Sequence, residues 1–183
     1  MKVALAIKNK KQIQQLLEVY PKVSKNRLLI EYALRTGLRI SDILSVRVQD
    51  VWGKDTYIVT EKKTSKTKEL ALHDGLKLSI MNYVAAQDLK YDDYLFYSNM
   101  NKQAPIQRAQ AHKIIAKAGD MIGLTLSSHS LRKTFGYHAY TQGVDISLLQ
   151  TIFQHSSQAV TLRYIGITQE NINQVYKKID LGF

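Results

Sequence analysis

The sequence contains no cysteine, only two prolines and only nine glycines among its 183 residues. Without cysteine the chain can form no disulfide, no thiolate nucleophile and no cysteine-ligated zinc site. The scarcity of proline and glycine, together with 45% hydrophobic residues, favours an ordered, mostly helical chain that can bury a core. The length predicts a single domain.

Long apolar runs are also missing. No stretch of the sequence approaches the roughly 18 residues needed to span a bilayer. The apolar part of residues 1–8 is too short for a signal peptide, and the polar residues that follow interrupt it. We therefore expect no membrane association and a cytoplasmic location.

Acidic side chains are too few to balance the basic ones. The chain has 26 lysines and arginines against 15 aspartates and glutamates, a formal net charge of +11. Such a charge says nothing about the fold but indicates polyanionic partners. With a membrane surface disfavoured, a nucleic acid is the expected partner.

The hydrophobic periodicity and the turn residues predict a mainly α fold with a small antiparallel β-sheet (α+β). Two β-prone segments, 55–60 and 67–72, flank a lysine-rich turn and predict a hairpin. Residues 94–97 predict a brief extended piece before a polar loop. The helices are expected at 9–20, 26–36, from 40, from 74, at 105–119, 129–142, 145–154 and 169–179.

Several helix starts have a candidate capping residue. Ser24 is expected to cap the helix at 26–36, Ser41 the helix that begins near 40, and Asp74 the helix after the hairpin. Pro105 suits the first turn of the helix at 105–119. Gly37 is expected to end the helix before it with a positive φ.

Reactive side chains are concentrated between residues 128 and 164. His129 and Arg132 are three positions apart in a predicted helix, so they lie on one face about one turn from each other. His155 follows a second predicted helix, and Tyr164 lies a short, turn-containing segment further on. A planar cation, two near-neutral proton carriers and an oxygen nucleophile suit chemistry on a phosphate.

Three motifs occur in order around the predicted hairpin. Residues 36–42 read Thr-Gly-Leu-Arg-Ile-Ser-Asp, and residues 129–135 read His-Ser-Leu-Arg-Lys-Thr-Phe. Residues 155–157 read His-Ser-Ser, and Tyr164 stands nine positions after that histidine. In this order the motifs resemble those of the tyrosine recombinase (phage integrase) family, over almost the whole chain. The resemblance implies the catalytic-domain fold of that family.

The resemblance implies a role for each matched residue. Tyr164 would attack a DNA phosphodiester, forming a 3′-phosphotyrosine and releasing a 5′-hydroxyl without metal, ATP or any cofactor. Arg39 and Arg132 would hold the non-bridging oxygens of the transition state, where fixed donors stabilise the developing charge. His129 would exchange a proton with the tyrosine or help to hold the phosphate, and His155 would hydrogen-bond the phosphate. The implied function is site-specific DNA recombination or integration.

Other residues are implied less directly. A lysine of the hairpin would protonate the departing 5′ oxygen. Lys63 fits the spacing of the family best and Lys66 is the second candidate, while Lys68 is a further basic residue that could contact DNA. Asp42 would either orient Arg39 or a nearby histidine, or cap the helix that follows.

One feature of the end of the third motif departs from the family. Members often have Leu-Gly-His before the two serines, whereas this chain has Phe153, Gln154 and His155. The turn ahead of His155 is therefore expected to form without the usual glycine.

The resemblance also implies partners and domain organisation. Double-stranded DNA is the expected substrate, with no small-molecule substrate, and paired DNA sites would bring together a tetramer. The helix at 169–179 would then dock on a neighbouring protomer; in the alternative, its apolar stripe belongs to the core. Typical members add a core-binding domain and some an arm-binding domain, for which 183 residues leave no room. We expect one catalytic domain, residues 1–183.

Alternatives remain at the level of residues and of function. Tyr137 and Tyr140 are the nearest rivals of Tyr164 as nucleophile, although both suit the core. His112 and His138 lie outside the motifs and are interpreted as surface or packing residues. The chain could instead be a DNA-binding module that does not cleave, or a relaxing enzyme of the type IB topoisomerase kind.

Raising the salt concentration is expected to weaken DNA binding steeply, because each cation that meets a phosphate releases a counterion. A protein with roughly six to ten phosphate contacts loses about 10³–10⁵-fold in affinity between 50 and 200 mM salt. Fluorescence anisotropy with labelled duplex DNA measures this slope. An affinity that does not change with salt would contradict binding through phosphates.

Overall fold

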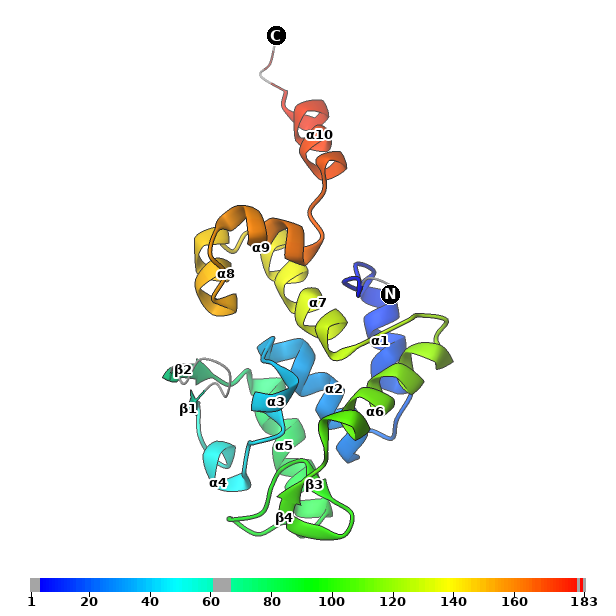
Figure 1. Cartoon of the computed structure of the whole chain (residues 1–183), viewed down its shortest axis with the longest axis vertical. Coiled ribbons are helices and arrows are strands. Elements are labelled where there is room, and N and C mark those ends of the chain that lie inside the picture. Colours follow the sequence, from blue (N-terminus) through cyan, green and yellow to red (C-terminus); the bar gives the residue numbers. More distant parts are fainter. Residues whose placement is uncertain (1–3, 61–66, 181, 183) are drawn as a thin grey trace.

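Helix α2 (Lys25–Thr36) is the buried centre of the molecule, with other helices packed around it (Figure 1). The computed structural model describes residues 4–60, 67–180 and 182. The other helices are α1 (Lys10–Glu18), α3 (Ile40–Ile43), α4 (Val48–Val51), α5 (Asp74–Ala86), α6 (Arg108–Met121), α7 (Ser128–Thr141), α8 (Ile146–Phe153), α9 (Gln158–Ile165) and α10 (Gln169–Lys178).

The sequence of α2 explains both its limits and its central place. The side chain of Ser24 accepts a hydrogen bond from the backbone N–H of Arg27, which satisfies one of the free donors of the first turn. Gly37 ends the helix in the left-handed conformation, as expected. Seven of the twelve residues are buried, more than one face could supply, so neighbours must cover the helix on several sides.

Two small antiparallel sheets complete the fold. Strand β1 (Thr56–Thr60) pairs with β2 (Thr67–Ala71), with Tyr57 opposite Leu70, and alternate residues of β1 point into the core. Strand β3 (Tyr97–Ser98) pairs with β4 (Asn101–Pro105). The predicted mainly α fold with small antiparallel β-structure is confirmed.

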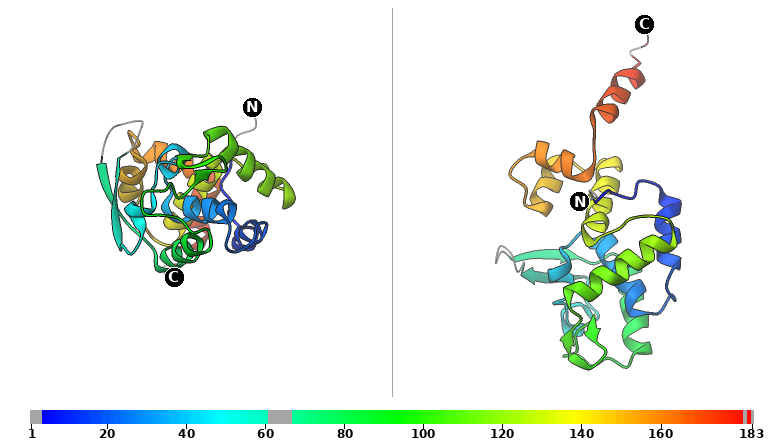
Figure 2. Two further views of the ribbon diagram at one scale, coloured as in Figure 1. Left: turned by 90° about the horizontal axis from the view of Figure 1, so that it is seen from below. Right: turned by 45° about the vertical axis from the view of Figure 1, so that its right-hand side comes forward.

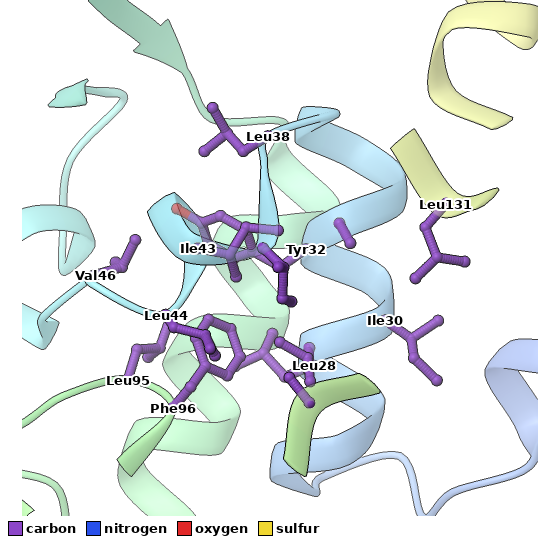
Figure 3. Close-up of a cluster of buried hydrophobic side chains, with 14 of the residues drawn as sticks. Leu28, Ile30, Tyr32, Leu38, Ile43, Leu44, Val46, Leu95, Phe96 and Leu131 are labelled. Carbon is purple, nitrogen blue, oxygen red and sulfur yellow. The ribbon is translucent and has the colours of Figure 1, made fainter. Parts of the chain in front are cut away.

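The core has two parts. The larger part surrounds α2, and Figure 3 shows Leu28, Ile30 and Tyr32 of this helix among side chains from α3, from the segment before β3 and from α7. The smaller part joins α7, α8 and α9, and its fully covered residues are Leu149, Phe153 and Ile165. This second cluster carries the segment in which the sequence concentrates reactive groups.

Helix α10 projects away from both parts of the core (Figures 1 and 2). Tyr176 is 77% exposed and Ile179 is 59% exposed, so these two members of the predicted apolar stripe are not core residues of this chain. Within the residues that the structure describes, no helix has the length and apolar character needed to cross a membrane.

The structure corrects several local predictions. Arg39, not Ser41, occupies the N-cap of α3, and no side chain caps that helix. His73 rather than Asp74 caps α5. Pro105 ends strand β4, because the predicted polar loop pairs as a second hairpin, and the next helix therefore starts only at Arg108. The short segment between His155 and Tyr164, expected to contain a turn, is largely helix α9.

Gly136 lies in the middle of α7, where α8 and α9 approach most closely. A Cβ at this position would lie 2.6 Å from the ring of Phe153 and 2.7 Å from Cγ2 of Ile165. The backbone of α7 can therefore meet these neighbours only if residue 136 has no side chain.

Gly136→Ala is expected to destabilise the protein by about 1–3 kcal/mol, because overpacking outweighs the better helix propensity of alanine. Urea denaturation monitored by circular dichroism measures the change. Thr141→Ala at the exposed end of the same helix serves as the control, with a change within about 0.5 kcal/mol. Equal stability of Gly136→Ala and the wild type would contradict the packing argument.

Candidate active site

The turn between α2 and α3 carries Arg39. Gly37 adopts a φ of +60° and its N–H donates to the carbonyl of Ala33. Any side chain at position 37 would overlap the ring of Phe135 on α7. The turn therefore packs directly against α7. Arg39 follows this turn as the N-cap of α3 and is half-buried.

Arg132 of α7 is only 4% exposed. Its guanidinium donates one hydrogen bond to the carbonyl of Gly37 and another to the carbonyl of Phe153, at 3.3 Å. It also lies 4.6 Å from the centre of the Phe153 ring. A buried guanidinium must find acceptors for its N–H groups, and here the acceptors come from the α2–α3 turn and the end of α8. Arg132 therefore joins two motifs that are far apart in the sequence.

Tyr164 lies on α9 beside this cation. Arg132 is close enough for its charge to lower the pKa of the phenol. The ring of Tyr164 packs with that of Phe153 at a centroid separation of 5.4 Å and with that of His155 at 4.8 Å. The structure thus groups three of the predicted catalytic residues, Arg132, His155 and Tyr164, around the ring of Phe153.

Electrostatics in this group follow from burial next to guanidinium groups. Burial raises the pKa of Tyr164, while the neighbouring guanidinium of Arg132 and the charge of Arg39 oppose the rise. Burial also lowers the pKa of His155, and the same two arginines lower it further. At neutral pH the phenol is therefore protonated and the imidazole neutral. Arg39 is close enough to influence both groups.

The hydrogen bonds of His155 assign its tautomer. Its Nδ1 lies 3.2 Å from Oγ1 of Thr161, and that hydroxyl donates its own proton to the carbonyl of Ser157. Oγ1 is then an acceptor, so Nδ1 carries the proton and Nε2 keeps a lone pair. Nε2 is the atom of His155 that can accept a proton or bind an acidic group.

His129 faces the other side of the site. It lines a cavity of about 580 Å³ together with Arg39 and Arg132. Burial lowers the pKa of His129, and the charge of Arg132 adds to this effect. The cavity is large enough for a phosphate group and is lined by three arginines, the third being Arg108, and one histidine.

A second cavity of about 600 Å³ lies between β2 and α8 and reaches His155. Lys68 lines it, and its Nζ donates to the carbonyl of Ile152 at 3.5 Å. The predicted catalytic lysines, Lys63 and Lys66, lie outside the described residues. The structure therefore places the hairpin strand beside the site, and the identity of the catalytic lysine stays a prediction.

Asp42 is a buried carboxylate of α3, 1% exposed. Its Oδ1 accepts a hydrogen bond from the hydroxyl of Ser41 at 3.3 Å. The predicted roles in orienting Arg39 or capping the helix stay predictions. In the part of the chain that the structure describes, no three His, Asp or Glu side chains come together to hold a metal ion.

The rival residues have packing contacts. Tyr137 and Tyr140 pack against the smaller part of the core, and Lys8 lies 5.1 Å from the centre of the Tyr137 ring. His138 donates to the carbonyl of Ile7, and His112 lies 3.4 Å from the hydroxyl of Ser128.

The structure adds two basic residues that the motifs did not select. Arg108, at the start of α6, lines the same cavity as His129. Lys133 lies 5.2 Å from the centre of the Tyr164 ring. The sequence could have indicated Lys133, because it directly follows Arg132, whereas nothing in the sequence indicated that Arg108 reaches the site.

Comparisons with known proteins agree with this geometry. The model of the phage integrase family matches residues 8–171. The chain belongs to the phage integrase family. The members of this family are enzymes that cleave and rejoin DNA strands. The sequence-based recognition of the family is confirmed.

Relatives and solved structures cover the chain almost completely. "Probable integrase/recombinase YoeC" of Bacillus subtilis (strain 168) is 38% identical over 179 residues, 97% of either chain. Tyrosine recombinase XerA of Pyrococcus furiosus is 26% identical over 93% of this chain, which spans 60% of XerA.

Solved structures of similar proteins share the fold. A crystal structure of XerA recombinase has a TM-score of 0.78 at 20% identity, covering 95% of this chain and 63% of that one. XerH site-specific recombinase bound to palindromic difH substrate has a TM-score of 0.77 at 20% identity, covering 94% and 52%.

Gln154 shows how the turn before His155 forms without glycine. It has a φ of +56° and a ψ of 47°, the left-handed conformation that non-glycine residues rarely adopt. Its side-chain Oε1 is buried and has no hydrogen-bond partner among the described residues. The fold thus imposes strain on this residue in order to direct the chain from α8 to His155.

Gln154→Gly is expected to stabilise the protein by about 0.5–1 kcal/mol, because it removes the strain and the unsatisfied oxygen. The matched control is Gln142→Gly at the end of α7, where φ is −91° and glycine gains nothing. Thermal denaturation of both variants measures the difference. A Gln154→Gly protein no more stable than Gln142→Gly would contradict the assignment of strain.

Proposed function

We propose that the chain is a site-specific DNA recombinase or integrase that works through a 3′-phosphotyrosine at Tyr164. The observation that carries this proposal is that the ring of Phe153 packs against both Tyr164 and the buried guanidinium of Arg132, which places the phenol beside that cation. It sets the nucleophile against the group that would hold the phosphate. His155, in ring contact with Tyr164, and Arg39, in the shared cavity with Arg132, complete the group.

The proposed reaction exchanges one phosphate ester for another. The oxygen of Tyr164 attacks the phosphorus of one DNA strand while the bond to the 5′ oxygen breaks, so no bond energy is lost and ATP is not needed. Arg39 and Arg132 hold the non-bridging oxygens. Fixed donors of this kind stabilise the developing charge, and losing one typically costs about 10²–10³ in rate. No step requires a metal ion.

The pKa shifts support the proposed proton path. The phenol is protonated at neutral pH, so it must lose a proton as it attacks, and the neutral imidazoles of His129 and His155 are able to accept one. The departing 5′ oxygen gains a proton from a hairpin lysine, for which we keep Lys63 first and Lys66 second. Lys68 contacts the other side of the site and serves DNA binding.

Phosphate binding would also bring the target to the nucleophile. A phosphate oxygen is a charged acceptor, and charge-assisted hydrogen bonds are roughly twice as strong as neutral ones. The charge of Arg132 already acts on the phenol of Tyr164. A phosphate held by this guanidinium would therefore lie beside the phenol oxygen.

Double-stranded DNA is the proposed substrate, and the reaction would take place inside the cell, where that DNA is found. The relative XerH was solved with its DNA substrate. The net charge of +11 supports binding along phosphates.

We also propose that residues 1–183 act as one catalytic domain, as the match to 97% of YoeC supports. The exposed Tyr176 and Ile179 support docking of α10 on a neighbouring protomer in a tetramer.

Tyr164→Phe is expected to abolish covalent adduct formation while leaving DNA affinity within a few fold, because only the attacking oxygen is lost. A nicked suicide duplex, which releases the 5′ fragment after cleavage, traps the adduct, and a denaturing gel detects it. Sequencing the attached DNA end identifies the target.

Tyr140→Phe is the matched control and should keep full adduct formation. Adduct with Tyr164→Phe but not with Tyr140→Phe would identify a different nucleophile. A wild-type protein that binds duplex DNA but never forms adduct would be a binding module. Relaxation of plasmids that lack a recombination site, with no exchange products, would indicate a topoisomerase of type IB.

A further inference from the structure

The N-terminal segment, residues 4–8, lies along α7 and is held there by side chains of that helix. The backbone N–H of Ile7 donates to Oγ1 of Thr134 at 2.9 Å, and its carbonyl accepts from Nε2 of His138 at 2.9 Å. Thr134 and His138 are one helical turn apart, and Ile7 is 3% exposed. These two hydrogen bonds and the buried side chain fix the segment in one register on α7.

Two lysines extend this attachment to the helix that bears Tyr164. Nζ of Lys133 donates to the carbonyl of Ala4 at 2.8 Å and lies 5.2 Å from the centre of the Tyr164 ring. Nζ of Lys8 donates to the carbonyl of Gly166 at 3.2 Å. Gly166 is the C-cap of α9, two residues beyond Tyr164, so a cation meets the negative end of that helix.

The phenol ring of Tyr164 is thus contacted from several directions. Phe153 and His155 pack against the ring, the charge of Arg132 acts on the phenol, and Lys133 supplies a cation within the range of a cation–π interaction. Lys133 is one residue from Arg132, yet its ammonium is directed by the carbonyl of Ala4. The segment at 4–8 therefore determines where this ammonium stands.

We propose that Lys133, held by residues 4–8, is a positioning residue that fixes the ring of Tyr164 in line for attack, with Lys8 holding the end of α9. The inference rests on the proposed function of Tyr164. Lys133 acts through the phenol ring and does not touch the DNA. A misplacement of about 1 Å at a reacting group can cost 10²-fold in rate, so the loss of one contact to the ring is measurable.

Lys133→Met removes the ammonium and keeps most of the length of the side chain. With saturating protein on a nicked suicide duplex, we expect the single-turnover rate of adduct formation to fall about 10–100-fold. DNA affinity should stay within a few fold, and the salt dependence of binding should not change. Lys133→Arg should restore most of the rate, because a guanidinium can serve both Ala4 and the ring.

Lys117→Met is the matched control, since it makes the same change on an exposed position of α6 away from the site. It should keep the wild-type rate. Lys8→Met, at an exposed residue, should slow adduct formation in the same direction as Lys133→Met but less. This variant keeps the test valid if Lys133→Met does not fold.

The results distinguish a failure of the positioning role of Lys133 from a failure of the proposed function of Tyr164. A wild-type rate for Lys133→Met, or for Lys8→Met where Lys133→Met does not fold, would overturn the positioning role. A loss of affinity with a salt slope smaller by about one would instead show that Lys133 binds a phosphate, which also overturns it. If the wild-type protein forms no adduct, or Tyr164→Phe still forms it, the proposed function itself fails.

Discussion

The arrangement of the site depends on one buried cation, the guanidinium of Arg132. Its hydrogen bonds reach the carbonyls of Gly37 and Phe153, and its charge acts on the phenol of Tyr164. Breaking a buried charged interaction by removing one partner typically costs about 3–5 kcal/mol. The turn before α3 and the end of α8 are therefore held together by the same side chain that would bind the phosphate, and neither can move far without leaving a buried donor unsatisfied.

Packing around Phe153 makes this arrangement rigid. The ring contacts Arg132 on its face and meets the rings of Phe135, His155 and Tyr164, and it is 1% exposed. It approaches α7 so closely only because residue 136 is glycine. Gly37 plays the same role in the turn after α2, where the ring of Phe135, the residue before Gly136 on α7, covers its backbone. Because residues 37 and 136 have no side chain, the chain around the first and third motifs packs close enough to α7 to form hydrogen bonds with Arg132.

The sequence predicted the parts of this structure that have local causes. Caps and periodicity located most helices, the two β-prone segments located the hairpin, and the ordered motifs selected Arg39, Arg132, His155 and Tyr164. It predicted the extended piece at 94–97, which overlaps β3, but not β4 or the pairing of the two, because the polar residues of β4 have neither alternation nor strong β-propensity. Contacts such as that of Lys133 with Ala4 join residues 129 positions apart, and no local sequence pattern predicts them.

Helix α9 was missed for a related reason, and its geometry accounts for the nine positions between His155 and Tyr164. An eight-residue helix is too short to be stable alone, and α9 lacks the strong apolar stripe of α8, so it depends on contacts with α7 and α8 that no local pattern predicts. Ser157 caps it, and Thr161 lies one turn after the cap, where its hydroxyl accepts from Nδ1 of His155. Tyr164 follows Thr161 by three residues and therefore shares its face of the helix. The hydrogen bond that sets the tautomer of His155 thereby also sets the distance from the imidazole to the phenol, and a spacing shorter or longer by one residue would turn the phenol away from Arg132.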